Sequence, residues 1–129
     1  MFKWKPFKSH AGLDLQWKID CDSLTDEDWD CMAKLVHSMG IRFHDVMGVP
    51  RGGLKFAKAL KPYCEADPEL HTLLVDDVFT TGASIEEVRH EHCDKIGQAV
   101  VLFARGPCPW WVMPIFNLNF KATLGGQRK

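Results

Sequence analysis

The sequence lacks the features that mark membrane, secreted and nucleic-acid-binding proteins. No apolar run approaches the roughly 20 residues that a membrane-spanning helix needs, and the first residues lack the apolar core of a signal peptide. With a formal net charge of −1, the chain has no overall attraction for nucleic acid or for an anionic membrane. We therefore expect a cytoplasmic protein without a membrane or nucleic-acid partner.

The sequence also lacks a disulfide framework, internal repeats and low-complexity segments. Its five cysteines are odd in number, scattered and without a CxxC pair, which is typical of reduced thiols. His90, His92 and Cys93 are close in sequence, but this spacing spreads them around a helix and does not favour a metal site. The 129 residues suffice for one domain that buries about two-thirds of its chain surface.

The most informative part of the sequence is residues 73–84, where an apolar run, a pair of acids, a small hydroxyl-rich turn and a helix start follow one another. Its apolar start predicts a buried strand of a parallel sheet, and Asp76 and Asp77 follow at the expected carboxyl end of that strand. A small, hydroxyl-rich turn comes next and consists of Thr80, Thr81, Gly82, Ala83 and Ser84. Ser84 and Glu87 have the spacing of a capping box, so we expect Ser84 to be the N-cap of a helix.

A turn between a strand and a helix N-terminus has the chemistry of a phosphate site. Its amides and the first amides of the helix point at one place, with the positive end of the helix dipole behind them. Hydroxyls of the turn add donors, and Asp76 and Asp77 add acceptors for ribose hydroxyls or for water around Mg²⁺. Taken singly, these residues would be an ordinary strand end and helix cap; their ordered combination favours a ligand site.

An earlier strand-to-helix turn carries a second set of candidate residues. Residues 45–49 predict a short strand and residues 54–61 a helix. Between them, Gly52 and Gly53 permit a close backbone approach to a ligand, and Arg51 supplies a planar fork suited to pyrophosphate oxygens. Alone, this turn would be a connection with an exposed arginine; together with the downstream stretch it predicts a pyrophosphate site.

Two further helices and one further strand complete the central pattern. Thr25 and Asp28 form a capping box at the start of a helix that Gly40 ends. A later helix, ended by Gly97, has an inward face made of Ile85, Val88, His92 and Ile96. Residues 99–103 are wholly apolar and predict the next buried strand.

The alternation of strands and helices predicts an α/β fold with an open, mainly parallel sheet and flanking helices. Ligand loops in such sheets leave the carboxyl ends of the strands, so the two turns should meet at one edge. We expect a single domain over residues 1–129, with a small N-terminal segment at about 1–22 and an α/β core at about 23–124.

The two ends of the chain leave alternatives open. Residues 1–8 alternate aromatic and basic side chains, which favours an edge strand packed on the domain over an arm that contacts nucleic acid or membrane. Residues 13–20 predict a second strand. Near the other end, Trp110 and Trp111 could form a wall for a base, a dimer contact or part of the core, and core or interface is favoured.

The two turns resemble those of a known family. The apolar run, Asp-Asp, spacer and Thr-Thr-Gly-Ala-Ser closely match the phosphoribosyl-pyrophosphate motif of type I phosphoribosyltransferases, and GVPRGG resembles their pyrophosphate loop. The resemblance implies that Asp76 and Asp77 hold ribose and the water shell of a Mg²⁺ cofactor. It also implies that residues 80–84 hold the 5′-phosphate and residues 51–53 the pyrophosphate. Asp76, Asp77 and Arg51 are then the expected catalytic residues, in a homodimer acting on small molecules.

Within that family the N-terminal half looks like the opening of orotate phosphoribosyltransferases, which forms a hood over the base. The match covers residues 7–20 loosely, since Ala11 stands where the family commonly has serine. The end of the 99–103 strand is also similar, although Ala104 replaces the usual aspartate. This resemblance implies that Lys18 and Arg105 face an anionic base, orotate.

One departure from the family leaves the activity open between two hypotheses. Family members have another strand and a long mobile loop with a catalytic lysine before the Asp-Asp strand, whereas here residues 62–72 must cover the whole distance. One hypothesis is a shortened phosphoribosyltransferase that transfers the phosphoribosyl group to orotate and releases pyrophosphate. The alternative is a catalytically silent sensor or regulatory subunit that binds phosphoribosyl pyrophosphate or a nucleotide.

Overall fold

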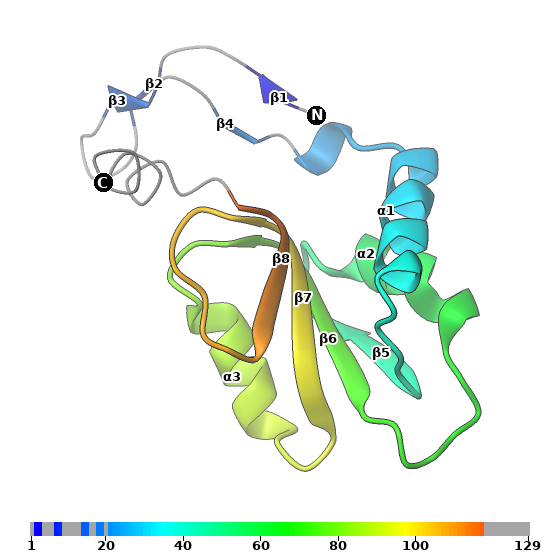
Figure 1. The fold of residues 1–129 in the computed structure, drawn as a ribbon. Coiled ribbons are helices and arrows are strands. Elements are labelled where there is room, and N and C mark those ends of the chain that lie inside the picture. The colour runs from blue at the N-terminus through cyan, green and yellow to red at the C-terminus, as the bar shows by residue number, and fades with distance from the viewer. Residues whose placement is uncertain (1, 4–6, 9–13, 16–17, 20, 118–129) are drawn as a thin grey trace, which may run out of the picture.

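A computed structural model describes the chain except residues 1, 4–6, 9–13, 16–17, 20 and 118–129. Within the described part, four parallel strands form one sheet in the order β5-β6-β7-β8 (Figure 1). The strands are β5 (Asp45–Gly48), β6 (Thr72–Phe79), β7 (Ile96–Ala104) and β8 (Val112–Asn117). The helices are α1 (Asp26–Ser38), α2 (Leu54–Leu60) and α3 (Ala83–Glu91). The predicted α/β fold with a parallel sheet is therefore confirmed.

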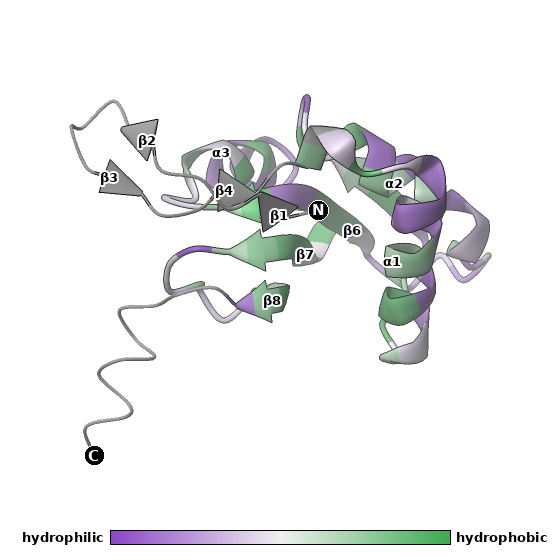
Figure 2. Ribbon diagram, turned by 90° about the horizontal axis from the view of Figure 1, so that it is seen from above, coloured by the Kyte–Doolittle hydropathy of each residue, from purple (hydrophilic) through white to green (hydrophobic). Residues whose placement is uncertain are grey.

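The helices cover the two faces of the sheet. Seen along the strands, α1 and α2 lie on one side of the sheet and α3 on the other (Figure 2). Side chains alternate between these faces, as expected for a strand. Val75 and Val100 pack in the cluster that contains Trp29 of α1, whereas Leu74 packs in the cluster that contains Ile85 of α3. Both faces of the central strands are thus buried.

The first predicted helix is confirmed, including its cap. The Asp28 N–H donates to Thr25 Oγ1 at 3.1 Å, and the Thr25 N–H donates to Asp28 Oδ2 at 2.9 Å. Gly40, with φ of 81°, follows the helix as predicted. Short 3₁₀ turns precede α1 at Cys21–Ser23 and follow α2 at Lys61–Tyr63. None of the described helices is long and apolar enough to cross a membrane.

The boundaries around the acidic motif differ from the prediction. β6 runs to Phe79, so Asp76 and Asp77 lie within the strand and not at its end. The strand continues because Asp76 and Phe79 keep their pairing with Val101 and Ala104 of β7. The same acids lie beyond the pairing with β5, which stops at Val75. On that side, β6 has no strand neighbour within the described part of the chain.

The predicted limits of α3 were wrong at both ends. The helix begins at Ala83 with Gly82 as N-cap, so Ser84 lies inside the first turn and forms no capping box. Gly82 is the N-cap instead of Ser84, because the backbone at Gly82, with φ of 83°, ends the preceding turn two residues before Ser84. At the other end the helix stops at Glu91, and Ile96 belongs to β7, where it pairs with Thr72.

The aromatic tail forms a strand that the sequence pattern did not predict. β8 pairs in parallel with β7 after a connection of only residues 105–111. Trp111 is buried in the core on the α3 side, whereas Trp110 is 88% exposed. Of the two favoured roles, core or interface, core is thus confirmed for Trp111 but not for Trp110.

Of the strand predicted over residues 13–20, the structure describes Asp14–Leu15 and Lys18–Ile19 as strand, and the remaining residues lie outside the described part of the chain. β1 (Phe2–Lys3) pairs with β4 (Lys18–Ile19), and β2 (Phe7–Lys8) pairs with β3 (Asp14–Leu15), both antiparallel. Figure 1 shows β1 and β4 beyond the carboxyl ends of the sheet strands.

Candidate functional site

The predicted ligand turns meet at the carboxyl edge of the sheet. Residues 51–53 follow β5, and residues 80–84 follow β6; we call them the pyrophosphate loop and the phosphate loop. Backbone hydrogen bonds tie this edge together. The Val49 N–H donates to the Val75 carbonyl at 2.9 Å, and the Arg105 N–H donates to the Phe79 carbonyl at 2.9 Å. The loops that leave β5, β6 and β7 are therefore neighbours, as expected for a ligand site in an open α/β sheet.

The pyrophosphate loop packs directly against the acidic motif. A Cβ placed on Gly52 would lie 2.5 and 2.6 Å from the two carboxylate oxygens of Asp77, so only glycine leaves room for that carboxylate. A Cβ on Gly53 would strike the backbone of Val49 and Val75. The structure thus brings together two motifs that are more than 20 residues apart in the sequence. Arg51 is exposed, and its peptide bond with Pro50 is cis.

The phosphate loop has the shape expected of an anion cradle. A Cβ on Gly82 would lie 2.7 Å from Cζ of Phe79, so the buried Phe79 ring supports the loop from below. The Ala83 N–H donates to Thr81 Oγ1 at 3.4 Å, and Glu86 is the first residue whose N–H bonds back to Gly82. The amides of the first helical turn are left without intrahelical partners.

A small hollow lies beside these amides. It has a volume of about 60 Å³ and is lined by the phosphate loop, by Asp76 and by residues 78, 79 and 85. A single water molecule needs about 10–15 Å³ of such space, so the hollow has room for more than one water or for a compact polar group. Thr80, Thr81 and Ser84 are exposed beside it. The loop therefore offers converging donors at an open position.

The two acids of the motif lie in different surroundings. Asp76 is buried, with 9% of its surface exposed, whereas Asp77 is half-buried. The Asp77 N–H donates to Asp76 Oδ1 at 2.8 Å, and the Val78 N–H donates to Asp77 Oδ1 at 2.7 Å. Burial, together with the neighbouring Asp77 side chain, raises the pKa of Asp76 to about 7. Asp76 is thus a carboxyl group that can hold a proton near neutral pH.

The acids fit a Mg²⁺ ion that arrives with a phosphorylated ligand. Within the described residues, no group of three or more His, Cys, Asp or Glu could hold a metal by itself. Mg²⁺ usually keeps several waters and binds through one or two carboxylates plus substrate phosphates. Asp76 beside the phosphate loop and Asp77 beside the pyrophosphate loop supply that kind of donor set.

The raised pKa of Asp76 makes stability depend on pH. A folded-state pKa near 7, against roughly 3.9 for an unfolded aspartate, means that the folded protein binds more protons between these values. The unfolding free energy should therefore fall as the pH rises from about 4 to about 7. We expect Asp76→Asn, which cannot ionise, to unfold at a higher temperature than the wild type at pH 8, by on the order of 5 °C.

Thermal unfolding of both proteins at pH 5 and pH 8 measures this effect. Other carboxylates titrate in both proteins, so the difference between the two pH profiles isolates Asp76. Profiles that run parallel would show that this carboxyl group ionises in the folded state as it does in the unfolded chain.

Of the two residues predicted to contact the base, the structure describes the site of Arg105 more fully than that of Lys18. Arg105 follows β7 at the same edge as the ligand loops, and the next residue, Gly106, lies against the carbonyl of Thr80. Lys18 lies in β4, but its side chain is outside the part of the chain that the structure describes. Gly106 and Phe79 were not predicted as parts of the site. Their only signal in the sequence is their position beside predicted site residues.

The connection between α2 and β6 lies at the opposite end of the sheet. Residues 64–71 contain no lysine or arginine. The Glu65 N–H donates to the Phe43 carbonyl at 2.9 Å, and Arg42 forms an ion pair with Glu65 at 2.8 Å. The His44 N–H donates to the His71 carbonyl at 3.0 Å, next to the amino ends of β5 and β6. This segment is therefore an ordinary connection far from the ligand loops, and it supplies no lid.

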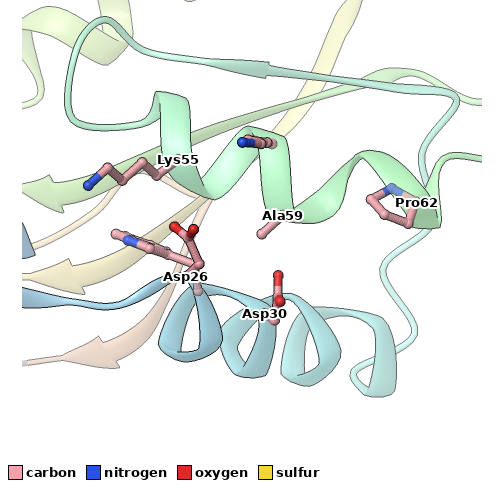
Figure 3. A pocket seen from close by; sticks show the side chains of 7 residues that line it. Asp26, Asp30, Lys55, Ala59 and Pro62 are labelled. Carbon is pink, nitrogen blue, oxygen red and sulfur yellow. The ribbon is translucent and has the colours of Figure 1, made fainter.

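A separate groove lies between α1 and α2 (Figure 3). Its volume is about 310 Å³, and Figure 3 shows the carboxylates of Asp26 and Asp30 pointing from α1 towards α2. Lys55 and Lys58 line it from α2. The groove includes none of the predicted site residues, so the ligand loops and not this larger hollow define the candidate site.

Comparisons with known proteins agree with this geometry. No protein-family model and no curated protein sequence matches the chain. Solved structures do match. Orotate phosphoribosyltransferase from Aeropyrum pernix has a TM-score of 0.72 at 21% identity, over 98% of this chain and 93% of that one.

Two further structures are similar to a comparable extent. Orotate phosphoribosyltransferase from Mycobacterium tuberculosis H37Rv, in complex with inorganic phosphate, has a TM-score of 0.70 at 15% identity, covering 95% of this chain and 89% of that one. A phosphoribosyltransferase from Corynebacterium diphtheriae has a TM-score of 0.67 at 12% identity, covering 88% of each chain.

These similarities establish the fold. The chain has the α/β fold of type I phosphoribosyltransferases, as the two sequence motifs predicted. Among the solved structures that share it, several are orotate phosphoribosyltransferases.

Proposed function

We propose that the protein is a phosphoribosyltransferase that moves the phosphoribosyl group of phosphoribosyl pyrophosphate to a nucleobase, with orotate as the expected base. The observation that carries this proposal is the contact between Gly52 and the Asp77 carboxylate. It joins a loop suited to pyrophosphate with a strand whose next turn is suited to a 5′-phosphate. A ligand that carries both groups on one ribose matches this arrangement.

Each part of the site has a role in binding. The phosphate loop would bind the 5′-phosphate through the first amides of α3 and the hydroxyls of Thr80, Thr81 and Ser84. Asp76 borders this loop and Asp77 borders the pyrophosphate loop, so the ribose hydroxyls would lie between the loops and donate to the two acids. The side chain of Arg51 and the amides of Arg51 and Gly52 would bind the leaving pyrophosphate, since the Gly53 N–H already donates to the Val49 carbonyl.

The reaction needs charge stabilisation more than covalent help from the protein. The bond from C1′ to the pyrophosphate oxygen breaks, positive charge develops on the ribose ring, and a base nitrogen forms the new bond to C1′. Mg²⁺, when bound with the substrate, would offset negative charge on the pyrophosphate. Asp76 and Asp77 would stabilise the cationic ring, and Arg51 would stabilise the departing anion.

A turnover assay tests the proposal. Purified protein, orotate, phosphoribosyl pyrophosphate and Mg²⁺ should yield orotidine monophosphate and pyrophosphate, followed by the loss of orotate absorbance and by phosphorus NMR. Calorimetric binding of phosphoribosyl pyrophosphate should be measured beside it. If a purine base turns over better than orotate, the base assignment is wrong although the phosphoribosyl site stands.

Arg105 is the residue on which the choice of base is tested. It leaves β7 at the same edge as both ligand loops, and orotate carries a carboxylate that a guanidinium would pair with. We expect Arg105→Ala to weaken orotidine monophosphate binding by about one to two decades, because a charge-assisted hydrogen bond contributes roughly 1.5–3 kcal/mol. Ribose-5-phosphate, which lacks the base, should bind as it does to the wild type. Equal losses for both ligands would show that Arg105 supports the edge and does not select the base.

A second candidate function is favoured by the connection over residues 64–71. It lies at the amino edge of the sheet and carries no lysine or arginine, so it cannot close over pyrophosphate with a permanent cation. A protein that binds phosphoribosyl pyrophosphate or a nucleotide as a sensor would need no such closure. Tight binding in calorimetry without any product in the turnover assay would favour this function.

A further inference from the structure

The loop that follows β7 lies directly against the phosphate loop. The Arg105 N–H donates to the Phe79 carbonyl at 2.9 Å, which continues the pairing of Phe79 with Ala104 by one residue. A Cβ placed on the next residue, Gly106, would lie 3.3 Å from the carbonyl oxygen of Thr80. Two consecutive residues after β7 therefore meet two consecutive residues at the end of β6 and the start of the phosphate loop.

Glycine at position 106 matches this close approach and not a special backbone angle. Among the described residues, Gly40 and Gly82 are the glycines with positive φ, so the backbone at Gly106 is open to other residue types. A Cβ at 3.3 Å from the Thr80 oxygen is tighter than an ordinary van der Waals contact. A side chain at position 106 must therefore move one of the two loops.

The loop after β7 is the part that would move. The phosphate loop is held between β6 and α3, and the buried Phe79 ring lies against Gly82. Residues 105–111 contain neither helix nor strand. Because Arg105 directly precedes Gly106, a displacement of Gly106 shifts the backbone from which the Arg105 side chain extends.

We propose that Gly106 is a positioning residue for the base, because the room that it leaves for the Thr80 carbonyl seats Arg105 beside the phosphate loop. This inference rests on the proposed function, in which the Arg105 guanidinium pairs with the carboxylate of orotate. The base and the 5′-phosphate belong to one nucleotide, so the groups that bind them must stand at a matching distance. Gly106 sets that distance on the protein side. A larger residue keeps the phosphate contacts and misplaces the guanidinium.

Calorimetric binding of orotidine monophosphate and of ribose-5-phosphate to the full chain tests the proposal. Gly106→Val should weaken orotidine monophosphate binding at least about tenfold, because a charge-assisted hydrogen bond contributes about one to two decades and depends on alignment. Ribose-5-phosphate should bind as it does to the wild type, since the phosphate loop stays in place. Thermal unfolding checks that the variant folds. If it does not, Gly106→Ala is used, with an expected loss of about threefold.

A double variant tests whether Gly106 acts through Arg105. If it does, Gly106→Val should add almost nothing to the loss of orotidine monophosphate affinity that Arg105→Ala causes. Losses that add up in the double variant would overturn the proposal. So would a folded Gly106→Val protein that binds orotidine monophosphate like the wild type, or one that loses both ligands equally.

Gly97→Ala is the matched control. A Cβ on Gly97 would lie 2.8 Å from Cγ of His71, so this glycine is also crowded, but it lies at the amino end of β7, away from the ligand loops. The variant should unfold at a lower temperature and keep its affinity for orotidine monophosphate. An equal loss of affinity here would show that any crowded glycine of β7 and its loop affects the site, against the proposal. A wild-type protein that binds neither ligand would refute the proposed function, whereas one that binds both, with an unaffected Gly106→Val variant, would refute this inference alone.

Discussion

Replacing Gly82 by valine is expected to abolish measurable binding of ribose-5-phosphate, with a loss of at least about two decades in affinity. Two effects act together. The backbone at Gly82 has φ of 83°, where a β-branched residue is strained, and a Cβ would lie 2.7 Å from Cζ of the buried Phe79. The loop must move, and the amides that would bind the 5′-phosphate move with it. Calorimetry with ribose-5-phosphate measures the loss.

Gly40→Val provides the control for backbone strain. Gly40 has a similar φ of 81°, but nothing lies within 4 Å of a Cβ there, and the residue follows α1 away from the ligand loops. This variant should lower the unfolding temperature and keep its affinity for ribose-5-phosphate. A Gly82→Val protein that is folded and binds the ligand like the wild type would remove the phosphate loop from the proposed site.

The sequence was sufficient to predict that the local segments of the candidate site lie together at one edge of the sheet. The phosphate loop, the pyrophosphate loop and the acids are each continuous, and the order of strands and helices implies that their loops share an edge. The capping of α1 was also predictable, because Thr25 and Asp28 bond to each other within one turn. The capping box predicted for Ser84 and Glu87 is equally local but was wrong, because Gly82 with its positive φ becomes the N-cap of α3.

Features that depend on distant partners were not predictable. β6 extends beyond the acids because β7 offers pairing partners up to Ala104, which the apolar run at residues 73–75 does not reveal. β8 was missed because parallel strands are usually joined by a dozen residues or more, whereas here residues 105–111 suffice. Pro114 within β8 also argues against a strand, although it is tolerated because β8 is an edge strand of the described sheet.

The contact between Gly52 and Asp77 is a feature of the candidate site that the sequence could not predict, because it depends on residues distant in the chain. Two glycines in a turn indicate that the backbone needs space, but not what fills the space. The structure shows that Gly52 makes room for the Asp77 carboxylate of β6 and that Gly53 makes room for the backbone of Val49 and Val75. The glycine pair therefore lets the pyrophosphate loop pack closely against β6.

Replacing Arg51 by alanine is expected to have the largest effect on turnover. Arg51 is the only cation within the two ligand loops, and the connection over residues 64–71 adds none. Negative charge on the departing pyrophosphate would then lack its guanidinium partner. An arginine that stabilises a phosphate-like transition state can contribute 10³–10⁵ in rate, so we expect a loss of about three decades in kcat. Steady-state kinetics with orotate and phosphoribosyl pyrophosphate measures it.

Two further variants separate charge from geometry. Lys55→Ala removes an exposed cation from the first turn of α2, a few residues after the loop, and should change kcat by less than about threefold because a solvated charge acts weakly. Arg51→Lys should recover only part of the rate, since an ammonium group keeps the charge but not the planar fork.

If the protein binds its ligand without turnover, the same variants should be compared by their affinity for pyrophosphate. There Arg51→Ala should cost about one to two decades and Lys55→Ala almost nothing. An Arg51→Ala variant that retains both turnover and pyrophosphate affinity would show that this arginine faces solvent and that backbone amides alone bind the anion.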